Sequence, residues 1–372
     1  MPTTTTAAVI ESAGEQFTLH EVELDDLRPD EVLVRMVAAG LCHTDLSVQA
    51  GYIPFALPGI LGHEGAGVVT AVGSAVTRVA PGDSVALSFT SCGACRHCRS
   101  AHPAYCTTWV PTNMFNGGVR GDGSATVRRG GTVLGGRFFG QSSFSASAVV
   151  DERSVVKVPA DVPLELVAPL GCGIQTGAGT VLNILRPEPG TTLAVFGTGA
   201  VGLAAIAAAA LNPLAAVVAI DRVGSRLDLA MELGASHRID ASSEDVPKAL
   251  DEITGGAGLD YAIDTTANMG VLRTAVEALG TFGSCAAVGA APVGTEIVLD
   301  YTGLLVGRSI IGVTEGDSDP ETFIPLLVEL YRQGRLPLDK LVKTYPFAEI
   351  NQAAADARDG STIKPVLLFG EA

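Results

Sequence analysis

The stretch Leu193-Ala-Val-Phe-Gly-Thr-Gly-Ala-Val-Gly202 decides the fold of the middle of the chain. An apolar run of strand type leads directly into a G-x-G-x-x-G pattern formed by Gly197, Gly199 and Gly202. In a strand–turn–helix context the first glycine permits the tight turn, the second lets backbone approach a pyrophosphate, and the third lets helix and strand pack closely. We therefore predict a dinucleotide-binding βαβ unit, whose loop also contains Thr198, Ala200 and Val201.

The residues after this glycine loop support the same interpretation. An alanine-rich segment leads to a second apolar strand that ends at Asp221, 19 positions after Gly202. An acid there accepts hydrogen bonds from the adenosine ribose and repels a 2′-phosphate, which favours NAD over NADP. The neighbouring Arg222 could hold a phosphate, so NADP stays an alternative. Residues 193–220 contain no charge, but their glycines and the Asn212-Pro213 pair predict a buried βαβ unit and not a membrane span.

Four of the seven cysteines lie in one short segment. Cys92, Cys95, Cys98 and Cys106 follow the spacing C-x2-C-x2-C-x7-C, which allows a tightly folded loop to aim four sulfurs at one point. Four thiolates in this arrangement favour a tetrahedral zinc, with disulfides or an iron–sulfur cluster as the alternatives. Because all four positions of such a zinc are filled, we predict a structural site.

Cys42, His63 and Cys172 form a second candidate set, each in a turn-rich context. Two cysteines and one histidine leave one coordination position open, as a catalytic zinc requires. Taken singly, each of these residues could equally be a buried core side chain, and their distance in sequence does not join them. Cys285 stands in an apolar run without such neighbours and is expected in the core.

Composition excludes several classes of function. With 372 residues, 47% of them hydrophobic and 17% charged, the chain suits a globular protein of two domains. A formal charge of −16 opposes binding to nucleic acid or to anionic lipid. The threonine-rich residues 1–8 lack a basic segment followed by an apolar run, so we expect a cytoplasmic protein with no membrane contact.

With these motifs in place, the chain resembles the zinc-dependent medium-chain alcohol dehydrogenases. The run Gly62-His63-Glu64-x2-Gly67-x5-Gly73-x2-Val76 is similar to the family signature, and it stands in the family's order with both metal sets and the glycine loop. Segments 138–144, 171–177 and 315–318 look like those of the bacterial aryl-alcohol (benzyl-alcohol) dehydrogenases. The resemblance implies reversible oxidation of a small primary alcohol, aromatic or allylic/terpenoid, to its aldehyde, with NAD and two zincs per chain.

The resemblance also implies roles at the metal. A zinc on the two-cysteine, one-histidine set would act on the alcohol as a Lewis acid, while Thr44 would hydrogen-bond the alcohol oxygen and Asp45 would orient His63. Glu64 is expected either to tune zinc coordination or to pair with a buried arginine. Ser47 replaces the proton-relay histidine of liver-type relatives. The proton must then leave through the cofactor ribose and water or through His43.

The remaining expected contacts concern the cofactor and the alcohol pocket. His43 and Lys364 are placed near the pyrophosphate, Arg226 near the adenosine ribose, and Thr176 and Val288 near the nicotinamide. For Arg226 and Lys364 the alternative is an ordinary solvated charge, and for Val288 an ordinary strand residue. Three aromatic residues are expected to line the alcohol pocket or, equally, to be core residues: Phe89, Phe138 and Phe139.

The predicted architecture is α/β with two domains. Residues 1–173 form a β-rich GroES-like catalytic domain with both zincs, 174–313 a doubly wound Rossmann NAD-binding domain, and 314–372 return to the catalytic domain. The active site is expected in the cleft between the domains. Residues 117–136 are expected to form an irregular loop. By analogy with relatives we expect a homodimer or homotetramer, with 309–313 as a strand at the pairing edge.

Two other kinds of function remain open at this point. Another enzyme of the same fold, such as a thiol-dependent formaldehyde dehydrogenase or a polyol dehydrogenase, would differ mainly in its pocket. A non-catalytic nucleotide- or zinc-binding protein would keep the fold and lose the chemistry. The complete set of two cysteines and one histidine, together with Thr44, argues against the latter.

Overall fold

A computed structural model describes residues 3–370, and the chain folds into two units. Unit 1 comprises Met1–Cys172, Asp319–Arg332 and Leu338–Ala372, and unit 2 comprises Gly173–Ser318 and Gln333–Pro337. The divisions therefore fall after 172 and 318, where the sequence suggested 173 and 313. Among the described residues, no helix is long and apolar enough to cross a membrane.

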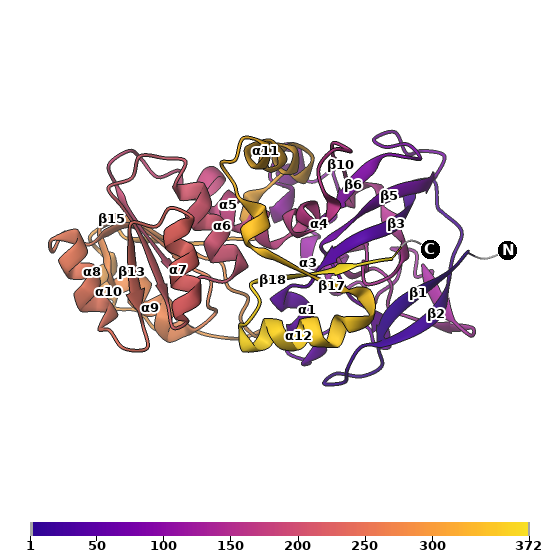
Figure 1. Ribbon diagram of the computed structural model, residues 1–372, viewed down its shortest axis with the longest axis horizontal. Helices are drawn as coiled ribbons and strands as arrows, with labels where there is room; N and C mark the ends of the chain where they lie inside the picture. Colours follow the sequence, from indigo (N-terminus) through magenta and orange to yellow (C-terminus); the bar gives the residue numbers. More distant parts are fainter. Residues whose placement is uncertain (1–2, 371–372) are drawn as a thin grey trace. The chain divides into compact units, whose positions relative to one another are not determined.

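Unit 1 is built around two sheets (Figure 1). The first has the order β4-β1-β2-β7-β8, and the second has the order β10-β6-β5-β3-β18-β17 with β9 also paired to β3. Buried aliphatic and aromatic side chains fill two clusters against these sheets. The strands are β1 (Thr3–Ile10), β2 (Thr18–Leu24), β3 (Glu31–Gly40), β4 (Gly59–Ile60), β5 (Gly65–Val72), β6 (Ser84–Leu87), β7 (Val127–Arg129), β8 (Thr132–Val133), β9 (Ser147–Asp151), β10 (Val155–Lys157), β17 (Val342–Pro346) and β18 (Lys364–Leu368).

The helices of unit 1 are short except for two near the C-terminus. Strand β18 pairs antiparallel with β3, so the end of the chain completes a sheet begun by its first forty residues. The prediction of an irregular loop at 117–136 is wrong in part, because strands β7 and β8 lie within this range and pair with each other. The helices are α1 (His43–Gln49), α2 (Arg96–Arg99), α3 (Trp109–Asn113), α4 (Leu164–Val167), α11 (Pro320–Arg332) and α12 (Ile350–Asp359).

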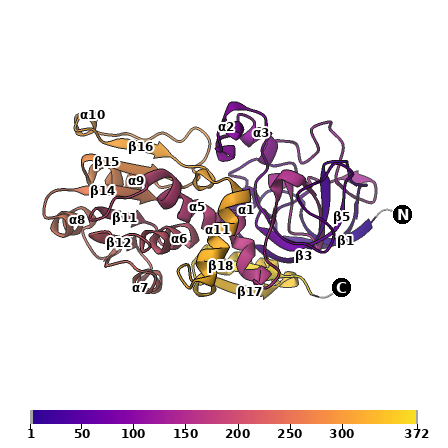
Figure 2. The ribbon, with the colours of Figure 1, turned by 90° about the horizontal axis from the view of Figure 1, so that it is seen from above.

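Unit 2 contains a parallel sheet with the order β13-β12-β11-β14-β15-β16. Figure 2 shows β12, β11, β14, β15 and β16 one after another in this order. The reversal of direction at β11 makes it doubly wound, which confirms the predicted fold. Its strands are β11 (Thr192–Phe196), β12 (Ala216–Asp221), β13 (His237–Asp240), β14 (Leu259–Asp264), β15 (Leu279–Ala287) and β16 (Ser309–Gly312). Its helices are α5 (Gly173–Gly179), α6 (Ala200–Ala209), α7 (Gly224–Glu232), α8 (Val246–Thr254), α9 (Met269–Glu277) and α10 (Tyr301–Leu304).

The glycine loop joins β11 to α6 as the sequence predicted. Gly197 has φ +89°, a conformation that side chains rarely adopt. A Cβ on Gly202 would lie 1.9 Å from the Gly197 carbonyl oxygen, so helix and loop touch there. A Cβ on Gly199 would meet nothing within 4 Å. That open space lies at the carboxyl end of β11, where the predicted dinucleotide would bring its pyrophosphate to the backbone.

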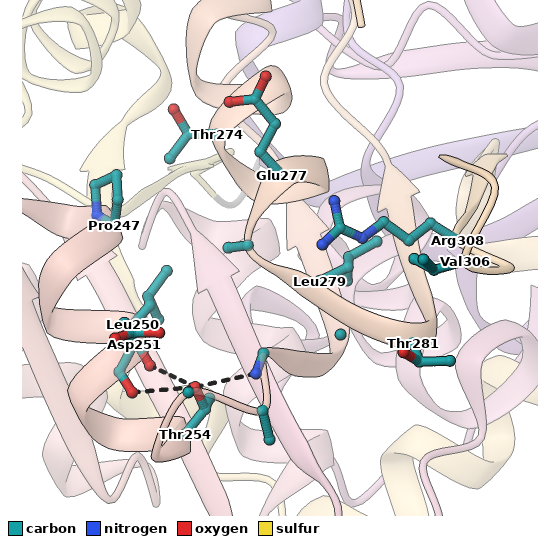
Figure 3. Close-up of a pocket in the computed structure, with 15 residues that line it drawn as sticks. Pro247, Leu250, Asp251, Thr254, Thr274, Glu277, Leu279, Thr281, Val306 and Arg308 are labelled. Carbon is teal, nitrogen blue, oxygen red and sulfur yellow. Dashed lines mark hydrogen bonds between the residues drawn. The ribbon is translucent and has the colours of Figure 1, made fainter. Parts of the chain in front are cut away.

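A separate pocket of about 390 Å³ lies near the amino ends of strands β14 and β15 of this sheet (Figure 3). Helices α8 and α9 contribute Leu250, Thr254 and Glu277, and Leu279 opens β15 at its amino end. Dinucleotides bind at the carboxyl ends of the strands in such folds. This pocket is therefore not the predicted cofactor site.

Candidate active site

Three segments of unit 1 bring the second metal set together. Cys42 immediately precedes α1, His63 and Glu64 lie between β4 and β5, and Cys172 precedes α5. One ligand atom from each of these four residues lies within 4.8 Å of all the others. Gly62, with φ +90°, makes the turn that admits His63 to this cluster. The structure thus joins residues that sequence separation alone could not join.

Asp45 fixes the orientation of the His63 ring. Its Oδ1 lies 3.0 Å from His63 Nδ1 and accepts from the Gly62 N–H at 3.0 Å, while Oδ2 accepts from the Cys42 N–H at 3.0 Å. The opposite nitrogen, His63 Nε2, is buried and has no hydrogen-bond partner among residues 3–370. A buried polar atom of this kind needs a partner. Together with two cysteine sulfurs it fits a zinc that keeps a fourth position open.

The Cys42 thiol is electrostatically suited to metal binding. Hydrogen bonding with Cys172 lowers the pKa of Cys42 well below its usual range, against the effect of burial, and Lys364 and His63 contribute. Thiolates, not thiols, bind metals. Thr44 Oγ1 lies 3.9 Å from Cys42 Sγ on the first turn of α1, whereas Ser47 stands one turn further along the same helix.

Glu64 forms a buried ion pair with Lys364. The Lys364 Nζ lies 2.9 Å from each carboxylate oxygen, and both side chains are buried. Burial raises the pKa of Glu64, and the Lys364 charge opposes that rise. The expected pairing with an arginine was wrong in the residue, because the buried partner is Lys364. Lys364 is not a solvated charge. Its ammonium is held by Glu64, and its expected place near the pyrophosphate stays a prediction.

Aromatic rings surround the imidazole of His63. Phe139 stacks on it with centroids 4.5 Å apart and planes at 28°, and Phe138 meets it edge-on at 5.4 Å. Trp109 packs edge-on against Phe139, and Phe89 lies beside Trp109. All three predicted phenylalanines are buried members of the core, and two of them, Phe138 and Phe139, contact the His63 ring.

The four clustered cysteines also converge. Their sulfurs lie within 4.8 Å of one another, with Cys95 Sγ and Cys98 Sγ 3.5 Å apart and Cys92 Sγ and Cys98 Sγ 3.9 Å apart. A tetrahedron with Zn–S bonds of about 2.3 Å has edges of about 3.8 Å, whereas a disulfide is about 2.05 Å long. Backbone N–H groups of Cys98 and Thr107 lower the pKa of Cys95 to about 5. The geometry thus fits a zinc held by four thiolates.

The predicted cofactor residues occupy unit 2, apart from His43 and Lys364. Asp221 ends β12, and its Oδ2 accepts from the Thr198 N–H at 2.6 Å and the Thr198 hydroxyl at 2.8 Å. Its carboxylate is thereby held against the glycine loop, where an adenosine ribose is expected. Thr176 is buried on α5, Arg226 lies half-buried on α7, Val288 follows β15, and His43 is the exposed first residue of α1.

Two polar residues near the metal set were missed as candidates. Gln141 is fully buried and hydrogen-bonds the His63 carbonyl and the Gly65 N–H, and Ser88 hydrogen-bonds the backbone before Cys172. Gln141 stood within one of the motifs carrying the resemblance, which was the available signal. Ser88 carried none.

Comparisons with known proteins agree with this geometry. Residues 28–160 match the alcohol dehydrogenase GroES-like domain family, and residues 200–331 match the zinc-binding dehydrogenase family. A geraniol dehydrogenase from Castellaniella defragrans is 43% identical over 98% of this chain and 97% of its own. The crystal structure of benzyl alcohol dehydrogenase from Acinetobacter calcoaceticus superimposes with a TM-score of 0.95 at 43% identity, covering 99% of this chain and 100% of that one.

A further solved structure, an alcohol dehydrogenase zinc-binding domain protein from Burkholderia ambifaria, gives a TM-score of 0.96 at 48% identity over the full length of both chains. Both family models and the full-length relatives thus agree with the two-unit fold. The chain belongs to the family of zinc-dependent medium-chain alcohol dehydrogenases.

Proposed function

We propose that this protein oxidises aromatic or allylic primary alcohols to aldehydes, reversibly, with NAD as the hydride acceptor. The observation that carries the proposal is the buried, unpartnered His63 Nε2 facing the sulfurs of Cys42 and Cys172. The relatives named for geraniol and benzyl alcohol support the substrate class. We propose two zincs per chain, one at this set and one at the four clustered cysteines.

The chain's own residues divide the work of the reaction. Zinc, when bound by Cys42, His63 and Cys172, supplies a Lewis acid that makes an alcohol hydroxyl more acidic. Asp45 holds the His63 ring so that Nε2 faces the metal position. Thr44, two residues after Cys42, is proposed to accept the alcohol proton through its hydroxyl. Exposed His43 at the start of α1 is proposed to pass that proton to solvent, because Ser47 cannot act as a base near neutral pH.

The cofactor is proposed to bind along the glycine loop of unit 2. The space beside Gly199 admits the pyrophosphate, and the Asp221 carboxylate favours the free ribose of NAD over the 2′-phosphate of NADP. Thr176, Arg226 and Val288 are proposed as further cofactor contacts. For Val288 the carbonyl is the available group, because its N–H donates to the Asp264 carbonyl.

The test combines metal analysis with NADH absorbance during exposure to benzyl alcohol or geraniol. We expect two zincs per chain and NADH production, and Cys42→Ser should keep one zinc and lose turnover. Cys285→Ser, at a buried cysteine outside both metal sets, is the control and should keep both zincs. Turnover only of a formaldehyde–thiol adduct or a polyol would select another enzyme of this family. Two zincs without any turnover would indicate a binding protein.

We further propose a cytoplasmic homodimer. Strand β16 ends the sheet of unit 2, and its Ile310 and Ile311 side chains are 37% and 36% exposed. An unpaired sheet edge with apolar side chains is a surface that a second copy can extend by strand pairing. The reduced thiolates required by both metal sets suit the cytoplasm.

A further inference from the structure

We infer that Gln141 and Ser88 form a polar bracket that fixes the position of His63 relative to Cys172. The inference rests on the proposed function, because it concerns the catalytic metal set. Asp45 connects only two of the three ligand segments, those of Cys42 and His63. Asp45 does not bond the segment of Cys172, which Gln141 and Ser88 reach.

Gln141 supplies the first half of this connection. Its Nε2 donates to the carbonyl of His63 at 3.0 Å and to the carbonyl of Ser88 at 3.0 Å, and its Oε1 accepts from the Gly65 N–H at 3.1 Å. The two amide hydrogens and the oxygen are thus all engaged, in a side chain that is 0% exposed. Gln141 cannot move without leaving a buried polar group unpaired.

Ser88 supplies the second half. Its hydroxyl donates to the carbonyl of Gly171 at 2.7 Å, one residue before Cys172. The backbones touch here, because a Cβ on Gly171 would lie 2.1 Å from the Leu87 carbonyl oxygen. The bracket therefore runs from the His63 carbonyl through Gln141 and Ser88 to the backbone of Cys172.

The segment that carries Gln141 is itself held firmly. Ser142 Oγ accepts from the Phe138 N–H at 2.9 Å and donates to the Ile60 carbonyl at 2.7 Å, which ties the segment to β4. Phe139 and Ser142 have φ of +52° and +49°, a conformation that requires support from its surroundings. Side chains that orient metal ligands in this way are positioning residues, and their loss typically costs about 10- to 100-fold in metal affinity.

The test compares Gln141→Met, Ser88→Ala and the double variant in the zinc-loaded enzyme. The first measurement is the rate of zinc release to a chelator, with the Cys42→Ser protein identifying the release from the structural site. We expect release from the catalytic site to be about 10- to 100-fold faster in each single variant, with the structural site unchanged. The double variant should release little faster than either single one, because both belong to one connection.

A cobalt-substituted enzyme gives a second readout, since the visible spectrum of cobalt reports ligand geometry and not folding. Gln49→Met and Ser145→Ala are matched controls in unit 1. Gln49 is 5% exposed and bonds the Glu15 carbonyl and Arg358, and Ser145 is 2% exposed and bonds the Ser147 carbonyl. Both controls should keep the wild-type spectrum and release rate.

Two outcomes would overturn the bracket. One is a wild-type release rate and cobalt spectrum in both single variants, and the other is an equal change in the two controls. A wild-type protein that holds zinc only at the four clustered cysteines is a different failure. It would remove the proposed function itself.

Discussion

Lys364 is buried, which is rare for lysine, and its charge is compensated there by the Glu64 carboxylate. Removing one member of a buried ion pair leaves the other charge without compensation, which costs more than the pair itself contributes. We expect Lys364→Met to lower the free energy of unfolding by about 3–5 kcal/mol in chemical denaturation. Adding Glu64→Gln should restore most of this loss. A single variant as stable as wild type would contradict the role of the pair.

Asp221 offers a second test at the scale of one residue. Asn at this position keeps an oxygen for the Thr198 bonds but removes the charge that opposes a 2′-phosphate. We expect Asp221→Asn to raise the ratio of kcat/KM for NADP to that for NAD by about tenfold, a difference of about 1.4 kcal/mol. Asp228→Asn, at an exposed acid on α7, should leave this ratio unchanged. An unchanged ratio in the Asp221 variant would assign cofactor choice to other residues.

Single residues also show where sequence interpretation ends. The spacing of Cys92, Cys95, Cys98 and Cys106 is local, so their convergence could be predicted from the chain alone. Cys42, His63 and Cys172 are joined by tertiary folding, so the sequence offered them only as a candidate set, which the resemblance then supported. The partner of Glu64 lies 300 residues away, and no local pattern points to it.

At the scale of elements, the β11–loop–α6 unit contains one glycine needed for packing and another proposed for cofactor binding. A Cβ on Gly202 would collide with the Gly197 carbonyl, whereas a Cβ on Gly199 points into open space. We expect Gly202→Ala to lower the melting temperature and to abolish NAD binding. Gly199→Ala should melt within about 1 °C of wild type and still lose most NAD affinity, because its methyl group occupies the proposed pyrophosphate space. Calorimetric melting and NADH fluorescence titration measure the two effects. Normal NAD affinity in Gly199→Ala would contradict this placement.

Elements differ in how far their sequence predicts them. The strands and helix of the βαβ unit carry strong periodic signals and glycine landmarks, so they were predicted with their order. Strands β7 and β8 are short and lie in glycine-rich sequence typical of loops, and they form because β7 pairs with β2. Short strands of this kind depend on their partner more than on their own composition.

At the scale of the whole molecule, the exposed edge of unit 2 predicts association. We expect the protein to sediment as a dimer, and Ile311→Glu to shift it toward monomer, because the substitution places a charge on the proposed pairing strand. Leu326→Glu, at an exposed apolar position on α11 in unit 1, is the control and should leave the mass unchanged. A monomeric wild-type protein, or equal effects of both substitutions, would exclude this edge as the interface.

The late position of β18 has a consequence for how the protein is made. Glu64 leaves the ribosome 300 residues before Lys364, which at about 5–20 residues per second means about 15–60 s of synthesis. Throughout that interval the Glu64 carboxylate has no lysine partner. Strand β18, which pairs with β3 in the sheet, does not yet exist. The four clustered cysteines, by contrast, span fifteen residues and emerge together. A nascent chain can therefore assemble the four-cysteine set early, while the Glu64–Lys364 pair beside the other proposed metal set forms only when the polypeptide is nearly complete.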